Sequence, residues 1–394
     1  MRKNREKIIN DELSALNAKF PLRFTREVEN LRGKSITVDG RQYFNLASND
    51  YLNLANDTEL INAVREGASE YGVGSGGSRL ICGTHGVHAA VEEKIAGMKK
   101  TERGILFNSG YNANLGIISA VLDSNSLALC DRLNHASIID GVKLSGAKLV
   151  RYRHCDCEDL EVKLEQYRGK FKKAMIITDS IFSMDGDRAP LDEICGLSEK
   201  YDTFLLVDEA HATGVFGANG GGLSEEMNLS ERIDFNMGTF SKAAGIFGAY
   251  VGLTREKKKF LINKARPFIY TTALPPALVY GIIRCIEIMQ NRKEERIKLL
   301  KNAGTLRGKL LSAGFNLSNS SSQIIPLVVG HEQKTIHFAE YLRREGVFAV
   351  AIRPPTVPPG TSRIRLSLTS ALSRKDTRII SEIIISAGKS LNII

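Results

Sequence analysis

Between residues 104 and 253, short apolar runs alternate with stretches whose apolar residues recur at helical spacing. An apolar run of about four to eight residues between polar or turn residues is typical of a strand that is buried on both faces. Because such strands alternate with helices here, the sequence predicts an α/β domain with a mostly parallel central sheet. The predicted strands are residues 104–107, 126–130, 148–152, 174–178, 204–207, 235–238 and 249–253, and the predicted helices are 112–122, 161–167 and 190–201.

The N-terminal part of the chain has a different pattern. Residues 35–47 predict a hairpin whose tight turn is Asp39-Gly40. Residues 2–20 predict an amphipathic helix, because apolar side chains lie near helical spacing at Ile8, Ile9, Leu13, Leu16 and Phe20. We therefore treat residues 1–45 as an N-terminal helix and hairpin segment.

A second, smaller domain is predicted after Pro275-Pro276, which interrupts the alternating pattern. A long helix over residues 277–311 follows and can bridge two domains. Further on, the sequence predicts strands at 324–329, 347–352 and 363–368, a helix at 334–344 and a final helix from residue 374. These elements predict a large α/β domain over residues 46–285 and a small C-terminal α+β domain over residues 286–394.

Composition argues against several classes of protein. No apolar run of about 18 residues occurs, so no transmembrane helix is expected. The basic N-terminus lacks the apolar core of a signal peptide, which leads us to expect a cytoplasmic protein. The net charge of +10 is spread along the chain and its densest basic runs include acidic residues, which argues against a nucleic-acid partner. Cys155 and Cys157 lie beside His154, but a second ligand pair at matching spacing is missing, so no metal site is expected.

Three other functional classes can be tested by their sequence motifs, and none is supported. Gly72-x-Gly74-x-x-Gly77 matches a dinucleotide fingerprint, but it follows a helical pattern and not a strand. The tetrad Asp208-Glu209-Ala210-His211 is that of a helicase box, yet the chain has no G-x-x-x-x-G-K-[ST] loop for nucleotide phosphates. No G-x-S-x-G elbow occurs either, so a serine hydrolase would have no nucleophile site.

A lysine and an aspartate come after two of the predicted strands. Lys242 comes shortly after one apolar run, and Asp208 directly follows another. Ligands of open α/β sheets bind at the carboxyl ends of the strands. A lysine that bonds to an aldehyde and a buried acid that pairs with a ring nitrogen are what pyridoxal 5'-phosphate requires. A lysine is ordinarily a surface residue and an aspartate can simply cap a helix, but the small residues 243–245 leave room for a ring beside Lys242.

Other predicted strand ends offer the remaining groups that this cofactor needs. Residues 108–112 end an apolar run and begin a helix, whose first N–H groups favour an anion such as a phosphate. Thr239 and Ser241 add hydroxyl groups, and His211 could donate to the phenolic oxygen of the ring. His135 is a candidate for the ring face, although a lone histidine is more often structural.

With these residues the chain resembles the α-oxoamine synthases, which are fold-type I pyridoxal-phosphate enzymes, over nearly its whole length. The matching segments are 48–52 (SNDYL), 74–79 (GSGGSR), 134–137 (NHAS), 182–187 (FSMDGD), 208–211 (DEAH) and 239–242 (TFSK).

The resemblance implies a role for each matching residue. Lys242 would bind the cofactor aldehyde, Asp208 would pair with the ring nitrogen, and His135 would stack on the ring. Other cofactor contacts would come from Ser109, Gly110, Tyr111, Ser183, His211 and Thr239, with Thr271 and Thr272 of a second subunit completing the phosphate site. Substrate would be bound by Arg23, Asn49, Arg353 and Thr356.

Within this family, residues 352–358 (IRPPTVP) and 360–366 (GTSRIRL) look most like the branch that condenses L-alanine with a pimeloyl thioester. The resemblance implies a homodimer and a decarboxylative acyl transfer, with CoA or an acyl carrier protein bearing the thioester. Arg353 would clamp one of the two substrate carboxylates, because a guanidinium binds carboxylates at two points. The alternatives are a branch that uses glycine or serine, an aminotransferase, and a non-catalytic regulator that binds pyridoxal phosphate.

Overall fold

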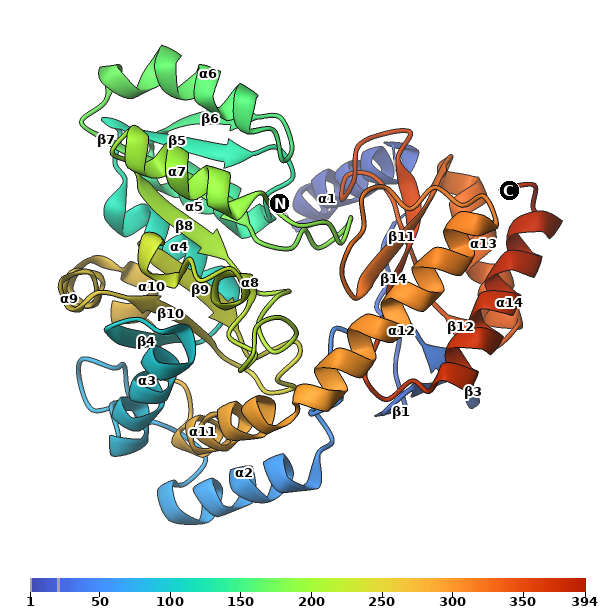
Figure 1. Cartoon of the computed structure of the whole chain (residues 1–394), viewed down its shortest axis with the longest axis horizontal. Coiled ribbons are helices and arrows are strands. Elements are labelled where there is room, and N and C mark those ends of the chain that lie inside the picture. The colour runs from blue at the N-terminus through green and yellow to red at the C-terminus, as the bar shows by residue number, and fades with distance from the viewer. Residues whose placement is uncertain (1, 20–21) are drawn as a thin grey trace.

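The computed structural model describes residues 2–19 and 22–394, and it is built around a seven-stranded sheet (Figure 1). The strand order is β4-β10-β9-β8-β7-β5-β6. The five strands from β9 to β6 pair in parallel, whereas β10 is antiparallel to both of its neighbours. The prediction of an α/β fold with a mostly parallel sheet is therefore confirmed. The bounds are β4 (Arg103–Phe107), β5 (Ser126–Asp131), β6 (Lys148–Tyr152), β7 (Lys173–Asp179), β8 (Phe204–Asp208), β9 (Phe235–Thr239) and β10 (Ala249–Leu253).

Helices cover both faces of this sheet, so its strands are buried on both sides. Successive residues of β5 show the division: Leu127 and Leu129 belong to one buried cluster, and Ala128 and Cys130 belong to the other. This two-sided burial explains why the strands are continuous apolar runs in the sequence. The helices of this region are α2 (Thr58–Tyr71), α3 (Gly86–Lys99), α4 (Gly110–Val121), α5 (Ala136–Ser145), α6 (Cys157–Tyr167), α7 (Leu191–Lys200), α8 (Leu223–Glu226), α9 (Arg255–Lys264) and α10 (Arg266–Ile269), with 3-10 turns at Arg168–Lys170 and Ser230–Arg232.

The second region of the fold joins the two ends of the chain. A three-stranded sheet has the order β11-β14-β13, and a four-stranded sheet has the order β1-β2-β3-β12. The predicted hairpin turns at Asp39-Gly40, and its strand β3 pairs in parallel with β12. The predicted strand 347–352 is divided, because β12 and β13 enter different sheets. The bounds are β1 (Asn30–Arg32), β2 (Ser35–Val38), β3 (Arg41–Asn45), β11 (Ile324–Gly330), β12 (Val347–Phe348), β13 (Val350–Ile352), β14 (Ser362–Ser367), α13 (Glu332–Arg344) and α14 (Arg374–Ser390).

The single long helix predicted over residues 277–311 is wrong, because the structure has two helices there (Figure 1). They are α11 (Pro276–Asn291) and α12 (Lys293–Ser312), and the break falls at Arg292. The first packs against α2 and α3, whereas the second packs against α14 and β11. A straight helix could not follow both surfaces. Residues 290–295 are all polar, so no apolar contact holds one helix axis through the break.

The N-terminal helix α1 (Arg2–Lys19) exists as predicted, but its predicted apolar face is not buried. Ile8, Ile9, Leu13 and Leu16 are all exposed. Phe20, the fifth residue of the predicted apolar face, lies outside the described residues. Throughout the part of the chain that the structure describes, no helix combines the length and hydropathy needed to cross a membrane.

A buried ion pair holds the end of α3 against the end of β8. Lys99 and Glu209 have fully buried side chains, and the Lys99 ammonium donates to the Glu209 carboxylate and to the carbonyl of Gly221. The carboxylate also accepts from the backbone N–H of Ser224 at 2.9 Å. The pair fixes the residue that directly follows Asp208, so it braces the strand end where the site lies.

We expect Lys99→Met to lower the free energy of unfolding by about 3–5 kcal/mol, because it leaves the Glu209 charge buried without its partner. Urea unfolding should show a lower midpoint. The double variant Lys99→Met/Glu209→Gln removes both charges and should recover part of the loss. A single variant as stable as the wild type would contradict this account of the pair.

Candidate active site

Lys242 lies in the turn between β9 and β10, at the edge of the sheet where β8 and β9 end. Its Nζ is 3.0 Å from Nε2 of His211. Several hydrogen bonds hold the turn; among them, the Thr239 hydroxyl donates to the carbonyl of Gly248 at 2.8 Å, and the N–H of Ser241 donates to the Thr239 hydroxyl at 3.1 Å. The amine is therefore presented from a fixed backbone.

The surroundings of Lys242 weaken its hold on a proton. Desolvation lowers the pKa of its amine to about 8, and the positive charge of Arg365 acts in the same direction. The carboxyl groups of Asp208 and Asp179 oppose the change without cancelling it. A lysine with a pKa of about 8 has an appreciable unprotonated fraction near neutral pH, which is the form that attacks a carbonyl carbon.

Asp208 is the last residue of β8 and is buried. One carboxylate oxygen accepts from Nδ2 of Asn114 at 2.9 Å, and the other accepts from the N–H of Ala210 at 2.9 Å. These donors orient the carboxylate at the carboxyl edge of the sheet. A cation or a protonated ring nitrogen placed there would meet a fixed, desolvated acceptor.

Asp179 lies beside Asp208 and was not among the predicted site residues. It ends β7, and the sheet register places it opposite Asp208. Its Oδ2 accepts from Nδ2 of Asn134 at 2.8 Å and from the N–H of His135 at 3.1 Å. Burial and the neighbouring Asp208 raise the pKa of Asp179 to about 8. Asp179 therefore carries little charge at neutral pH and acts mainly as an acceptor that positions the turn containing His135.

His211 connects Lys242 to a second layer of polar groups. Its Nδ1 is 2.7 Å from the hydroxyl of Tyr51, and its backbone carbonyl accepts from Nε2 of Gln323 at 2.8 Å. Desolvation, together with the charges of Lys242 and Arg365, holds the pKa of His211 well below its ordinary value of 6.5. The ring is therefore neutral, and it can donate to only one of its two polar neighbours.

The helix start that was predicted to bind an anion is the start of α4. Ser109 is the N-cap, and its hydroxyl accepts from the N–H of Asn112 at 3.2 Å. Gly110 and Tyr111 form the first turn, where backbone N–H groups have no helical acceptor. Thr271 and Thr272 lie against the same end of the helix, because Nδ2 of Asn108 donates to the Thr272 carbonyl at 2.9 Å and to the Thr271 hydroxyl at 3.5 Å.

His135 lies on the open side of the site as the N-cap of α5. Its side chain is exposed, and Nδ1 is 2.8 Å from the hydroxyl of Ser137. Because the hydroxyl and the backbone bond to Asp179 fix the ring at its base, one face can remain open to a planar group.

Arg365 is the largest omission from the predicted site. Its guanidinium is buried and donates to Asn49 Oδ1 at 3.1 Å, to the Tyr51 hydroxyl at 3.4 Å, and to the carbonyl of Ser183. It thereby brings Asn49 and Ser183, two predicted residues, close to the His211 and Lys242 pair. Strand β14 supplies the only guanidinium that lowers the pKa values of both Lys242 and His211 within the described chain.

Arg23, Arg353 and Thr356 form a separate group in a groove of about 660 Å³. Arg23 donates to the Thr356 hydroxyl at 3.1 Å. The groove also contains Arg343 and Glu340 of α13, and Lys242 is not among its lining residues. The structure thus divides the predicted substrate residues, since Asn49 joins the lysine and the other three line this groove.

The residues at the sheet edge fit pyridoxal phosphate. Lys242 offers an amine of lowered pKa, Asp208 offers a buried acid, and the N-terminus of α4 can receive a phosphate. Two buried amide oxygens at this edge, Oδ1 of Asn114 and Oδ1 of Asn134, have no hydrogen-bond partner in the described structure. Asn114 bonds to Asp208 and Asn134 bonds to Asp179, and unsatisfied polar atoms beside such carboxyl groups are expected where a polar group is to be bound.

Fold and site together define a fold-type I pyridoxal-phosphate enzyme, and comparisons with known proteins agree. The family model for aminotransferase class I and II matches residues 41–384. The 8-amino-7-oxononanoate synthase of Pelobacter propionicus is 42% identical over 388 residues, which cover 98% of this chain and 99% of the relative. This chain belongs to the aminotransferase class I and II family and, within it, to the α-oxoamine synthases.

Solved structures give the same assignment. A serine palmitoyltransferase from S. paucimobilis with bound PLP superposes with a TM-score of 0.91 at 30% identity, covering 100% of this chain and 99% of that one. The 8-amino-7-oxononanoate synthase from Francisella tularensis superposes with a TM-score of 0.78 at 30% identity, covering 88% and 98%.

We expect the Asp179 carboxyl to make the cofactor-free protein less stable as pH rises. Its folded-state pKa is raised from 3.8 to about 8, so the folded state holds the proton more tightly and stability falls between about pH 4 and pH 8. Asp179→Asn should remove this part of the fall, because both bonds to Asp179 end on one oxygen that asparagine retains. Thermal midpoints measured from pH 4 to pH 9 test this.

Asp123→Asn is the matched control, because the pKa of Asp123 is shifted the other way, to about 2, by Lys173 and Ser126. The Asp123 carboxylate stabilises the folded state above about pH 4, and this stabilisation is lost as pH falls toward 2. Asp123→Asn should therefore leave the slope of the thermal midpoint against pH unchanged between pH 5 and pH 8. Equal slopes in wild type and Asp179→Asn would contradict the assignment.

Proposed function

We propose that this protein is a pyridoxal-phosphate-dependent acyltransferase that condenses L-alanine with a pimeloyl thioester and releases carbon dioxide, a step of biotin biosynthesis. Relatives named 8-amino-7-oxononanoate synthase match nearly the whole chain at 42–44% identity. The single structural observation that carries the proposal is the placement of Lys242 and Asp208 together at the carboxyl edge of the sheet, with a helix N-terminus beside them.

Lys242, Asp208 and His135 would hold the cofactor and move the proton. When bound, pyridoxal phosphate supplies an electron sink for the α-carbon of an amino acid. Lys242 would hold the cofactor aldehyde, and its Nζ, when free, would accept the α-proton of L-alanine. Asp208 would accept a hydrogen bond from the ring N–H and so keep the ring nitrogen protonated, and His135 would cover one ring face. Ser183 and His211 would make further contacts to the cofactor.

Two arginine sites suit the two acidic substrates. Arg365, with Asn49, is the better candidate for binding the carboxylate of L-alanine, because its positive charge is close enough to Lys242 to lower the pKa of that amine. Arg353, with Arg23 and Thr356, would bind the acyl substrate in the groove, through the distal carboxylate of the pimeloyl group or the phosphates of its carrier. The acyl group then passes to the α-carbon, the carrier thiol and carbon dioxide leave, and Lys242 returns a proton to that carbon.

We further propose a cytoplasmic homodimer. The phosphate would be held by Ser109, Gly110, Tyr111 and Thr239 of one subunit. The family resemblance adds Thr271 and Thr272 of the partner, although in one chain these threonines also contact Asn108 beside the same helix start. Supporting the dimer, Tyr270 beside these threonines and Ile81 in the neighbouring loop are exposed apolar side chains, at 72% and 83%. Exposed apolar side chains that form a contiguous patch are typical of protein–protein contacts.

A second candidate is another acyl transfer of the same kind, with serine or glycine as the amino acid. It is favoured by the higher TM-score to a serine palmitoyltransferase, 0.91, than to the synthase from Francisella tularensis, 0.78. The curated relatives favour L-alanine. An aminotransferase would consume no thioester, and a non-catalytic regulator would release no carbon dioxide.

The direct test supplies the holoenzyme with L-alanine and pimeloyl-CoA, or with the pimeloyl carrier protein, and identifies products by mass spectrometry. We expect 8-amino-7-oxononanoate, free thiol and carbon dioxide in equal amounts. Glycine and L-serine with acetyl-CoA and palmitoyl-CoA are the comparison reactions. Product only from one of these pairs would replace the proposal with the second candidate.

Asp208→Asn should lower kcat by about 100- to 1000-fold, because a neutral amide cannot hold the proton on the ring nitrogen. The variant should still bind one cofactor per subunit through Lys242 and the helix N-terminus. Cofactor content by absorbance, followed by turnover at saturating substrate, separates these effects. Unchanged turnover at full cofactor content would exclude Asp208 from this role.

A further inference from the structure

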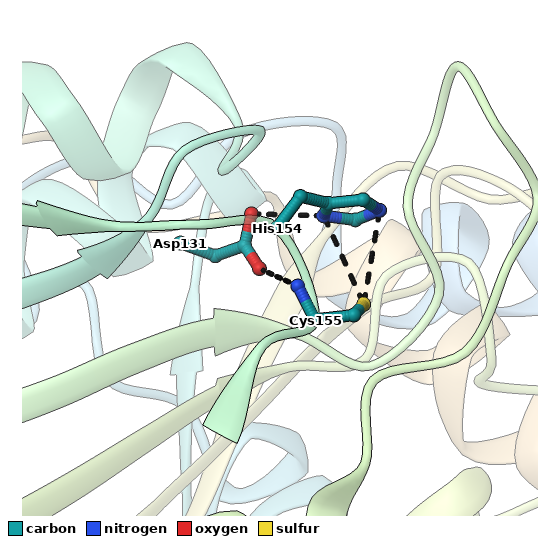
Figure 2. Close-up of side chains that lie close together, drawn as sticks. All are labelled: Asp131, His154 and Cys155. Carbon is teal, nitrogen blue, oxygen red and sulfur yellow. Dashed lines mark hydrogen bonds and ion pairs between the residues drawn. The ribbon is translucent and has the colours of Figure 1, made fainter. Parts of the chain in front are cut away.

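A histidine outside the proposed cofactor site joins three segments of the large sheet. His154 follows β6, and its Nδ1 is 3.0 Å from Oδ1 of Asp131 at the end of β5 (Figure 2). Its Nε2 is 2.7 Å from Oδ2 of Asp187, which lies in the loop after β7. The His154 ring also packs against the Phe182 ring in a T-shaped arrangement, with the ring centroids 4.4 Å apart and an interplanar angle of 88°.

The contacts of His154 require a charged ring. Both nitrogens face carboxylate oxygens, so both must donate, and only the imidazolium form has two N–H groups. Although desolvation acts to lower the pKa of His154, the bonds to Asp131, Asp187 and Cys155 outweigh it and raise the pKa to about 12. The ring therefore stays positive throughout the neutral range.

Asp131, His154 and Cys155 also have the chemistry of metal ligands, and their ligand atoms lie within 4.8 Å of one another (Figure 2). A metal would need a ring lone pair, however, and both ring nitrogens are committed as donors to carboxylates. The second oxygen of Asp131 accepts from the N–H of Cys155 at 2.9 Å. The arrangement is that of an ion-pair network.

Asp187 closes the loop that carries Ser183. The N–H of Phe182 donates to the Asp187 carbonyl at 3.1 Å, and the N–H of Gly186 donates back to the Phe182 carbonyl at 2.8 Å. The carbonyl of Ser183 accepts from Nε of Arg365. One side of this compact loop therefore contacts His154, and the other side contacts Arg365.

Asp131 holds the turn that carries His135 through hydrogen bonds to the backbone of that turn. Its Oδ1 accepts from the N–H of Leu133 at 2.8 Å, and its carbonyl accepts from the N–H of Asn134 at 3.1 Å. The same carboxylate thus shapes the turn before His135 and binds the His154 ring.

We propose that His154 is a positioning residue for the amino-acid substrate, whose imidazolium fastens the 182–187 loop to the end of β5 and thereby holds Arg365 in place to receive the substrate carboxylate. This inference rests on the proposed function, which gives Arg365 that task. Without His154, Asp131 and Asp187 would be two carboxylates facing each other with no cation between them. The loop would then move away from β5, and Ser183 would no longer fix the guanidinium.

The test compares the wild-type holoenzyme with His154→Gln and Asp187→Asn. Glutamine is neutral and has no rigid pair of opposed donors, whereas Asp187→Asn weakens only the contact to the loop. Asp123→Asn is the control, because it removes an ion pair at the opposite end of β5. Amide hydrogen exchange of residues 180–190 reports on the loop, and L-alanine titration of the cofactor absorbance reports on substrate binding.

We expect faster exchange in the 180–190 segment and at least a tenfold weaker Kd for L-alanine in both His154→Gln and Asp187→Asn, since a hydrogen bond to a charged group is worth about that factor or more. KM for the thioester should remain near the wild-type value, and Asp123→Asn should match the wild type throughout. A merely structural histidine would instead lower the unfolding midpoint without changing the Kd.

Unchanged loop exchange, or an unchanged Kd despite faster exchange, in either variant would overturn the positioning role. Failure of the proposed function looks different. The wild type would then not respond to L-alanine, while another amino acid would produce the absorbance change, and the same ratio between variant and wild type would be measured with that amino acid.

Discussion

Two carboxyl groups that end adjacent parallel strands set the electrostatics of this site. Asp179 and Asp208 lie in register at the ends of β7 and β8, and two ionised groups so close together in a buried place would repel each other. The protein relieves this conflict by raising the pKa of Asp179, which then positions the His135 turn mainly as a neutral acceptor. Asp208 is left to act on the charge of Lys242, and desolvation, together with the charges of Lys242 and Arg365, lowers the pKa of His211 and keeps its ring neutral.

Much of the fold could be predicted from the sequence because the central sheet is buried on both faces. That burial makes each strand an uninterrupted apolar run, and the helices between them keep their own period. The break at Arg292 could not be found in this way, since the residues around it are all polar and the bend follows from packing on two separate surfaces. The pairing of β12 with β3 was equally hidden, because it joins segments about 300 residues apart.

The site was predictable where chemistry coincides with a strand end. Lys242, Asp208 and the helix start at Ser109 all follow apolar runs, and Asp179 follows one too, so the same argument could have found it. Arg365 is different, because the segment contains three arginines, Arg353, Arg363 and Arg365, and only the pairing of β14 shows which one approaches Asn49. The His154 network depends on three separate segments, and no spacing in the sequence reveals it.

The most direct test of the central claim is to reduce the holoenzyme with borohydride and map the labelled peptide. Reduction fixes the cofactor to the amine that holds its aldehyde. The account predicts a single label per subunit on the peptide that contains Lys242, and no label in Lys242→Ala. A label on any other lysine, or a protein that takes up the cofactor without a reducible bond, would contradict it.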